Sequence, residues 1–188
     1  MILKRILDIV LSLFMIPVLL LPAILIGILI IIETKDSPIF MSHRVGKKNI
    51  LFLMPKFRTM RSNTPQMATH LLKDSQLYIT KIGKFLRRTS LDEIPQIFSV
   101  LMGQMSFVGP RPALYNQFDL IELREKNGIN LLTPGITGWA QINGRDDLSI
   151  SKKVEIEIYY KKNMSLLLDI KILFLTILKV FNMQNIKH

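Results

Sequence analysis

The sequence feature that most restricts the fold is an uncharged stretch near the N-terminus. Residues 9–32 contain no Asp, Glu, Lys or Arg. A straight helix of this length would extend about 36 Å, which is enough to cross the hydrocarbon core of a bilayer. The stretch is too long for a secretory signal peptide, and no small-residue cleavage site follows it. It therefore predicts a helix inserted into a membrane.

The charges around this stretch do not fit a simple transmembrane span. Lys4 and Arg5 precede it, and 23 of the 25 Lys and Arg residues follow it, so the positive-inside rule places both of its ends in the cytoplasm. Pro17 and Pro22 lie near its middle, and each removes a helix hydrogen bond. A re-entrant helix that bends and returns to the same face fits these facts. A single span with tolerated prolines is the alternative.

The composition combines a high hydrophobic content with a large positive charge, two properties that seldom occur together in one domain. The 188 residues are 49% hydrophobic, and their formal net charge is +11. An anionic phospholipid membrane satisfies both, because it attracts cations and accepts apolar side chains. Nucleic acid would account for the charge alone, and one Trp and four Tyr provide few stacking surfaces. The absence of cysteine excludes disulfides and cysteine-based zinc sites. We therefore expect a membrane partner and no nucleic acid.

A pair of adjacent carboxylates, Asp92 and Glu93, lies near the centre of the chain. Four cations precede the pair over residues 81–88, and apolar residues at helical spacing follow it over 94–105. A helix N-terminus beside clustered cations favours anions and suits chemistry on a phosphate. The same residues also fit a capping box, in which Ser90 and Glu93 bond each other's backbone N–H groups. The spacing alone leaves both interpretations open.

Three other basic residues lie where the local backbone is restricted. Lys56 and Arg58 would share one face of an extended segment, as two phosphate ligands would, although a solvated basic strand is the ordinary alternative. Arg111 lies between two prolines, which would hold its guanidinium in a stiff turn. A preset guanidinium suits bidentate phosphate recognition, and a plain loop between two helices is the alternative.

The glycine-rich residues 133–145 bring together three further polar side chains. Gln141, Asn143 and Arg145 alternate, so an extended backbone would present all three on one face. The glycines of this stretch allow tight turns and close approach of the backbone.

The remaining segments predict secondary structure rather than chemistry. Residues 33–49 are rich in turn residues and predict a loop, and the apolar run 50–54 predicts a strand. Residues 166–181 predict an amphipathic helix in the membrane interface, with its lysines at the headgroups. A buried core helix is the alternative for this last segment.

Five motifs occur in order behind the apolar N-terminal stretch: Lys-Arg-x-x-Asp at 4–8, Lys-Phe-Arg-Thr-Met at 56–60, Ser-Leu-Asp-Glu-Ile-Pro-Gln at 90–96, Gly-Pro-Arg-Pro at 109–112 and Pro-Gly-Ile-Thr-Gly-Trp-Ala-Gln-Ile-Asn-Gly-Arg at 134–145. Each motif alone is a weak signal, whereas five in order are highly specific. Together they resemble the bacterial sugar transferase family, the monotopic phosphoglycosyl transferases, over roughly residues 3–180.

The resemblance implies an activity, two substrates and a location. The family transfers a phosphosugar from a UDP-sugar to a polyprenyl (undecaprenyl) phosphate and releases UMP, in the first membrane step of glycoconjugate assembly. It acts at the bacterial inner membrane, with its catalytic domain on the cytoplasmic face. The resemblance names neither the sugar nor the oligomeric state, so a homodimer stays open.

The resemblance also implies roles for the residues singled out above. Asp92 would be the nucleophile that carries a covalent phosphosugar, and Glu93 would help to hold Mg²⁺ or assist the proton and phosphate steps. Mg²⁺ is the implied cofactor, with Asp92 and Glu93 as its ligands. The remaining candidates would bind substrate: Arg87, Arg111, Arg145, Lys56, Arg58 and Gln141.

The implied fold is α/β, mostly helical with little β structure. Residues 1–35 would form a re-entrant membrane helix, and residues 36–188 a catalytic domain with interfacial amphipathic helices. The chain departs from the family at the kink, where Leu21-Pro22 replaces the usual Ser-Pro. Two alternative classes of protein would account for fewer of these residues. A basic membrane-binding protein needs neither Asp92 nor Glu93, and a soluble glycosyltransferase makes no use of residues 9–32.

Overall fold

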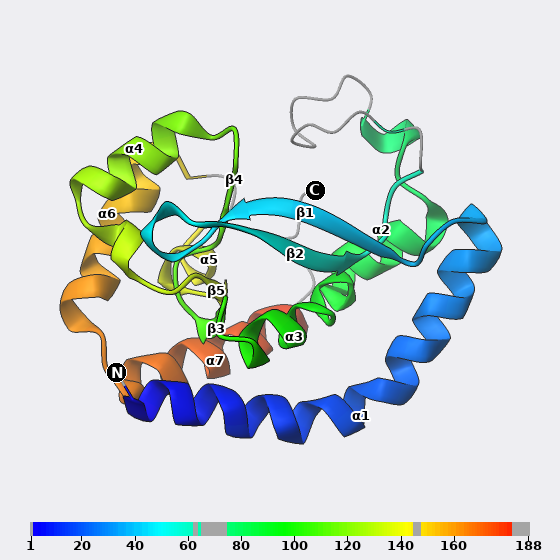
Figure 1. Ribbon diagram of the computed structural model, residues 1–188, viewed down its shortest axis with the longest axis horizontal. Coiled ribbons are helices and arrows are strands. Elements are labelled where there is room, and N and C mark those ends of the chain that lie inside the picture. Colours follow the sequence, from blue (N-terminus) through cyan, green and yellow to red (C-terminus); the bar gives the residue numbers. More distant parts are fainter. Residues whose placement is uncertain (1, 62–63, 65–74, 145–147, 182–188) are drawn as a thin grey trace.

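The computed structural model describes residues 2–61, 64, 75–144 and 148–181, and it shows a mixed α/β fold that is mostly helical, as predicted (Figure 1). The α-helices are α1 (Ile2–Thr34), α2 (Lys81–Thr89), α3 (Gln96–Leu101), α4 (Phe118–Lys126), α5 (Trp139–Ile142), α6 (Ile150–Asn163) and α7 (Leu166–Phe181). Short 3₁₀ helices are η1 (Lys47–Asn49), η3 (Ser75–Leu77), η4 (Leu91–Glu93) and η5 (Ile129–Leu131). The strands are β1 (Ile39–Val45), β2 (Leu51–Phe57), β3 (Ser106–Val108), β4 (Ala113–Leu114) and β5 (Gly135–Thr137).

Helix α1 contains the apolar stretch that predicted a membrane helix. By length and composition it is able to cross a membrane, and 6% of its most apolar window is buried. Pro17 and Pro22 lie inside it, and Figure 1 shows the helix bent into an arc along the edge of the molecule. Its first half packs Leu11 against the central core, and its second half buries Ile30 beside Leu86 of α2. The first half therefore contacts the central core, and the second half contacts a separate apolar cluster of the same folded domain.

Strands β1 and β2 form an antiparallel hairpin in which Ile39 lies opposite Phe57, and β4 pairs with the other edge of β1. Strands β3 and β5 form a separate parallel pair. The strand predicted at 50–54 is confirmed as part of β2. The loop predicted over 33–49 is wrong in its middle, because β1 occupies residues 39–45. Turn residues at both ends of the range obscured a short strand whose stability comes from pairing with β2.

The central core lies between the hairpin, α3, α7 and the β3–β5 pair. Its fully buried members include Val100 of α3 and Ile172 of α7. Helix α7 confirms the helix predicted over 166–181. It buries one face and exposes Leu167 and Phe174 on another, at 81% and 60% exposure. It therefore combines a core face with an exposed apolar face.

Helix α3 is shorter than the apolar pattern over 94–105 predicted. Pro95, which has no N–H to donate, immediately precedes the helix, and the residues before Pro95 form the separate turn η4. Phe98 and Met102 are 54% and 64% exposed, whereas Val100 is fully buried. Phe98 and Met102 therefore add to the exposed apolar surface.

Candidate active site

The Asp92–Glu93 pair lies in η4, the turn that joins α2 to α3. Ser90 ends α2 in the left-handed conformation, with φ of 58°, and its hydroxyl makes no capping hydrogen bond. The capping-box interpretation is therefore wrong. The left-handed residue ends α2 and begins η4, and the Glu93 carboxylate contacts residues of other elements.

Glu93 accepts hydrogen bonds from two cations that come from distant parts of the chain. Its Oε1 lies 2.8 Å from Nη2 of Arg111 and 3.2 Å from Nζ of Lys56, and the Glu93 side chain is 16% exposed. Burial alone would raise the pKa of Glu93, but attraction to Arg111 and Lys56 outweighs it and holds the pKa well below its ordinary value. Glu93 is therefore a charged anchor that fixes both cations beside Asp92.

The position of Arg111 depends on a close approach between two backbones. Gly109 lies against residues 133–135, and an added Cβ at Gly109 would come 2.4 Å from the carbonyl oxygen of Thr133. Gly109 also donates its N–H to the carbonyl of Thr137. A side chain at residue 109 would push the Pro-Arg-Pro turn away from β5, and Arg111 would move away from Glu93.

Asp92 is a buried carboxylate, 9% exposed, that accepts no hydrogen bond within the described part of the chain. Burial raises its pKa, attraction to Lys56, Arg111 and Arg87 opposes the rise, and repulsion by Glu93 adds to it. A carboxylate held among cations but not bonded by a neighbour keeps its lone pairs available for a reacting atom. Asp92 therefore has the surroundings of a nucleophile.

Arg87, at the end of α2, is the third cation that faces Asp92. Its Nε donates to the hydroxyl of Thr59 at 2.9 Å. Burial lowers the pKa of Arg87, and attraction to Asp92 offsets part of this effect. Thr59 was not among the predicted site residues, because nothing in its motif showed that its hydroxyl would orient an arginine of α2.

Arg44 of β1 is a further cation close to Lys56 and the Pro-Arg-Pro turn, and it was not among the predicted site residues. Its Nη1 donates to the carbonyl oxygen of Pro112 at 3.3 Å, directly beside Arg111. Its charge also acts to lower the pKa of Lys56, which burial lowers further and attraction to Glu93 raises. Arg44 lies in the segment predicted as a loop, so only the hairpin pairing reveals its position.

The structure places two predicted substrate ligands, Arg58 and Gln141, outside this cluster. Arg58 donates to the carbonyl of Ser37 at 2.7 Å, away from Glu93. Gln141 is helical rather than extended and donates to the carbonyl of Ile136 at 2.8 Å, so the alternating face predicted for its segment is wrong. Arg145 lies outside the described residues. Substrate binding by these three residues stays a prediction.

The carboxylates present are sufficient for one kind of magnesium site. The described residues contain no group of three or more His, Cys, Asp or Glu that could hold a metal ion. Mg²⁺ commonly takes one or two carboxylates and completes its octahedron with phosphate oxygens and water. Asp92 and Glu93 meet that smaller requirement. They would hold the ion through these carboxylates, and the ion would supply positive charge to a bound phosphate.

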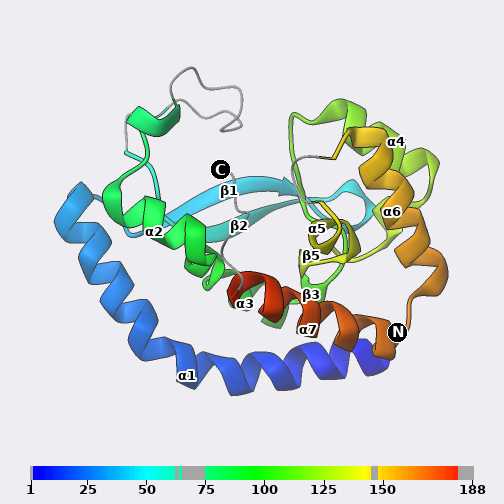
Figure 2. The ribbon, with the colours of Figure 1, turned by 180° about the vertical axis from the view of Figure 1, so that it is seen from behind.

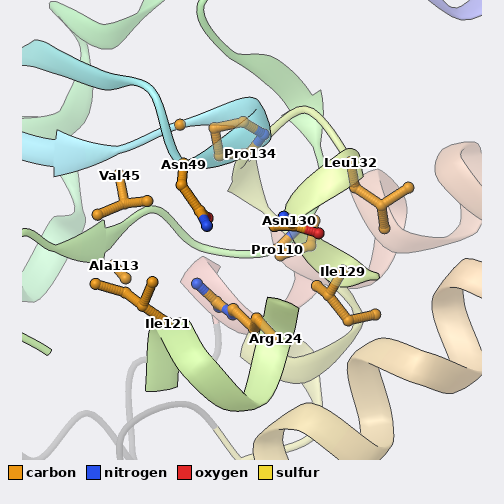
Figure 3. Close-up of a pocket in the computed structure, with 11 residues that line it drawn as sticks. Val45, Asn49, Pro110, Ala113, Ile121, Arg124, Ile129, Asn130, Leu132 and Pro134 are labelled. Atoms are coloured by element: carbon orange, nitrogen blue, oxygen red, sulfur yellow. The ribbon is translucent and has the colours of Figure 1, made fainter. Parts of the chain in front are cut away.

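A small hollow lies on the other side of the Pro-Arg-Pro turn (Figure 3). Asn49, Pro110 and Arg124 are among its lining residues. Arg124 donates to both carboxylate oxygens of the buried Glu157, at 2.5 and 2.8 Å. Because this ion pair neutralises the arginine, the hollow is a poorer anion site than the cluster around Asp92.

Comparison with known proteins agrees with the motifs. The sequence model of the family described as bacterial sugar transferase matches residues 1–183. The chain is 38% identical to the uncharacterized sugar transferase EpsL of Bacillus subtilis (strain 168), over 100% of this chain and 92% of that protein.

Two longer relatives have names that state a reaction. The chain is 38% identical to the UDP-N-acetylgalactosamine-undecaprenyl-phosphate N-acetylgalactosaminephosphotransferase of Aeromonas hydrophila, over 93% of this chain and 42% of that protein. It is 41% identical to the UDP-glucose:undecaprenyl-phosphate glucose-1-phosphate transferase of Escherichia coli (strain K12), over 95% of this chain and 40% of that protein. The chain spans less than half the length of these two relatives.

Proposed function

The chain belongs to the bacterial sugar transferase family of enzymes, and from this premise we propose that it transfers a sugar 1-phosphate from a UDP-sugar to undecaprenyl phosphate. The products would be UMP and an undecaprenyl-diphosphate-sugar, as in the first membrane step of polysaccharide or other glycoconjugate assembly. The observation that carries the proposal is the placement of Asp92, a buried carboxylate with no hydrogen-bond donor of its own among the described residues, within a cluster of cations.

The proposed reaction has two displacements at one phosphorus atom. In the first, a carboxylate oxygen of Asp92 bonds to the sugar-bearing phosphorus of the donor, and the bond from that phosphorus to the bridging oxygen breaks, so that UMP leaves. In the second, a phosphate oxygen of the acceptor bonds to the same phosphorus, and the bond to Asp92 breaks. Asp92 thereby regains its charge, and no oxidant or reductant is needed.

The cations of the cluster reduce the repulsion between the Asp92 carboxylate and the negatively charged diphosphate that it attacks. Lys56 and Arg111 are held on Glu93, and Arg87 is held on Thr59, so their positions are set before substrate arrives. Such preorganised charge stabilises the negative charge that develops on the phosphoryl oxygens and on the leaving group. Mg²⁺, when bound by Asp92 and Glu93, would neutralise part of the diphosphate charge.

We further propose that α1 is re-entrant and that the enzyme is monotopic. Lys4, near its start, forms an ion pair of 2.6 Å with Asp169 of α7, and Ile30, near its end, packs on Leu86 of α2. The two ends of α1 thus contact the same folded domain at two places, which favours a helix that leaves the bilayer on the side it entered. Residues 1–35 would be the membrane unit and residues 36–188 the catalytic unit.

The exposed apolar surface supports an orientation for the catalytic unit. Leu167 and Phe174 of α7, with Phe98 and Met102 of α3, are all more than half exposed. In an interfacial position these side chains would enter the headgroup region of an anionic bilayer. The excess of Lys and Arg after residue 32 supports, by the positive-inside rule, a catalytic unit on the cytoplasmic face of the bacterial inner membrane.

The first experiment measures UMP release from a panel of UDP-sugars with undecaprenyl phosphate and Mg²⁺. It compares the wild type with Asp92→Asn, and with Asp119→Asn as a control for loss of an exposed carboxylate. Release by the wild type and the control but not by Asp92→Asn supports the covalent mechanism and identifies the donor. Undiminished release by Asp92→Asn excludes Asp92 as the nucleophile. Lipid binding by the wild type without release from any donor would favour a basic membrane-binding protein.

A further inference from the structure

The helices on either side of Asp92 lie along the inner side of the α1 arc, and Figures 1 and 2 show this from opposite directions. The chain runs from α2 through η4 to α3, so that Asp92 lies between two helices. Helix α1 runs antiparallel to this segment: its start lies at the end of α3 and its end at the start of α2. One polar side chain of α1 contacts the segment at each of these two places.

Glu33, near the end of α1, binds the first backbone amides of α2. Its Oε1 accepts from the N–H of Lys81 at 2.8 Å, and its Oε2 accepts from the N–H of Ile82 at 3.1 Å. The first amides of a helix have no partner within the helix, and its dipole favours a negative charge there. Glu33 therefore fixes the start of α2 to the end of the membrane helix.

Arg5, near the start of α1, binds the last carbonyls of α3. Its Nη1 donates to the carbonyl of Val100 at 2.5 Å, and its Nη2 donates to the carbonyl of Leu101 at 2.7 Å. Gly103 follows with φ of 84°, and an added Cβ there would come 3.4 Å from Nη2 of Arg5. A cation at this end of a helix complements the dipole, so Arg5 fixes the end of α3.

Helix α1 bends between the two contacts, and Pro17 and Pro22 lie inside it (Figure 1). The bend lets one helix reach both outer ends of the α2–α3 segment. Packing of Ile26 and Ile30 against Leu91 and Ile94 seats the arc beside the turn that carries Asp92.

We propose that Arg5 and Glu33 are positioning residues that together clamp the outer ends of the α2–α3 segment and so set the orientation of Asp92. The proposal rests on the proposed role of Asp92. Neither residue touches the cation cluster around Asp92 and Glu93; each acts through a helix end. If α1, the membrane helix, is displaced, the turn that carries Asp92 loses its fixed orientation. Catalysis therefore depends on the contacts of α1 with both ends of the α2–α3 segment.

The experiment measures UMP release and hydrogen exchange for the full chain in anionic lipid nanodiscs. The variants are Arg5→Ala, Glu33→Ala, their double variant, and the milder Arg5→Lys and Glu33→Gln. Lys35→Gln is the control, because Lys35 is an exposed charge beside Glu33 with no side-chain partner among the described residues. We expect each alanine variant to lower kcat about 10- to 100-fold with KM for the donor within twofold, because a small misplacement of a reacting group has effects of this size.

Two further results separate a clamp from general loss of stability. If both ends must be held, the double variant has the kcat of the slower single variant within about twofold, whereas independent losses multiply. Amides of residues 88–98 exchange faster in the alanine variants than in the control, and the milder variants recover part of both properties. Multiplying losses, unchanged kcat, or a lower kcat without faster exchange in 88–98 would each overturn the clamp.

The same design separates the clamp from the function on which it rests. Absence of UMP release by the wild type would count against the proposed function alone. Hydrogen exchange would still test whether Arg5 and Glu33 hold the Asp92 turn, because it needs no substrate.

Discussion

Replacement of Lys56 by Met should separate the activity of the site from its stability. Lys56 is buried, and its pKa is lowered because burial outweighs the attraction of Glu93. At the 3.2 Å separation of Nζ and Oε1, the attraction between the two charges is about 5 kcal/mol at an effective dielectric constant of about 20. Removing each ion from water costs several kcal/mol. Met has a similar volume without that cost, and Glu93 keeps Arg111, so the free energy of unfolding should change by less than about 1.5 kcal/mol.

Activity should respond much more strongly to the same substitution. A preorganised donor to a developing negative charge typically contributes about 2.7–4 kcal/mol, or 10²–10³-fold in rate. We therefore expect Lys56→Met to lower kcat/KM at least 100-fold in the UMP-release assay, while thermal unfolding in the same lipid moves by a few degrees at most. A large loss of stability, with activity per folded molecule unchanged, would refute this account of Lys56.

The lowered pKa of Lys56 also predicts the shape of the pH profile. Because the folded-state pKa lies below the unfolded value, the unfolded chain binds more protons between the two values, and stability at this residue should rise with pH through that window. Activity should fall in the same window, since Lys56 loses its charge. Lys56→Arg should keep its charge and extend activity to higher pH. If activity falls at the same alkaline pH in the wild type and in Lys56→Arg, the fall is caused by the titration of another group.

Three further predictions concern other contacts. Arg111→Lys should lower kcat/KM about tenfold in the UMP-release assay, because lysine is a point charge that cannot reproduce the planar fork; wild-type kinetics would show that charge alone suffices. EDTA should abolish UMP release, and added Mg²⁺ should restore it; full activity in EDTA would remove Mg²⁺ from the mechanism. Tyr160→Phe removes a 2.6 Å hydrogen bond to the buried Asp169 and should reduce the free energy of unfolding by about 1–3 kcal/mol in chemical denaturation, with kcat per folded molecule unchanged.

The sequence predicted the site residues that are neighbours in the chain. It did not predict those that strand pairing or a side-chain contact brings to the site. Asp92 and Glu93 were found because they are neighbours beside a basic segment. Arg44 and Thr59 were missed, because one reaches the site through the register of a hairpin and the other through a hydroxyl that orients an arginine from α2. The capping box predicted at Ser90 was wrong, because sequence spacing cannot show that a residue has a left-handed backbone. A capping residue does not adopt that conformation.

The balance of charge in the site bears on how one pocket can accept two anionic substrates. Lys56, Arg87, Arg111 and Arg44 carry four positive charges, and Asp92 and Glu93 carry two negative ones. Before Mg²⁺ is counted, the side chains therefore have a formal surplus of two, which equals the charge of a diphosphate diester. When Asp92 becomes part of a phosphodiester-like linkage, its own charge is replaced by the single charge of the bound phosphate. Departure of UMP then restores the surplus of two. The acceptor phosphate, which carries about −1.5 to −2 at neutral pH as other phosphomonoesters do, would meet the same field that the donor met. A covalent intermediate at Asp92 therefore lets a single set of cations serve both half-reactions, without a second anion site elsewhere in the chain.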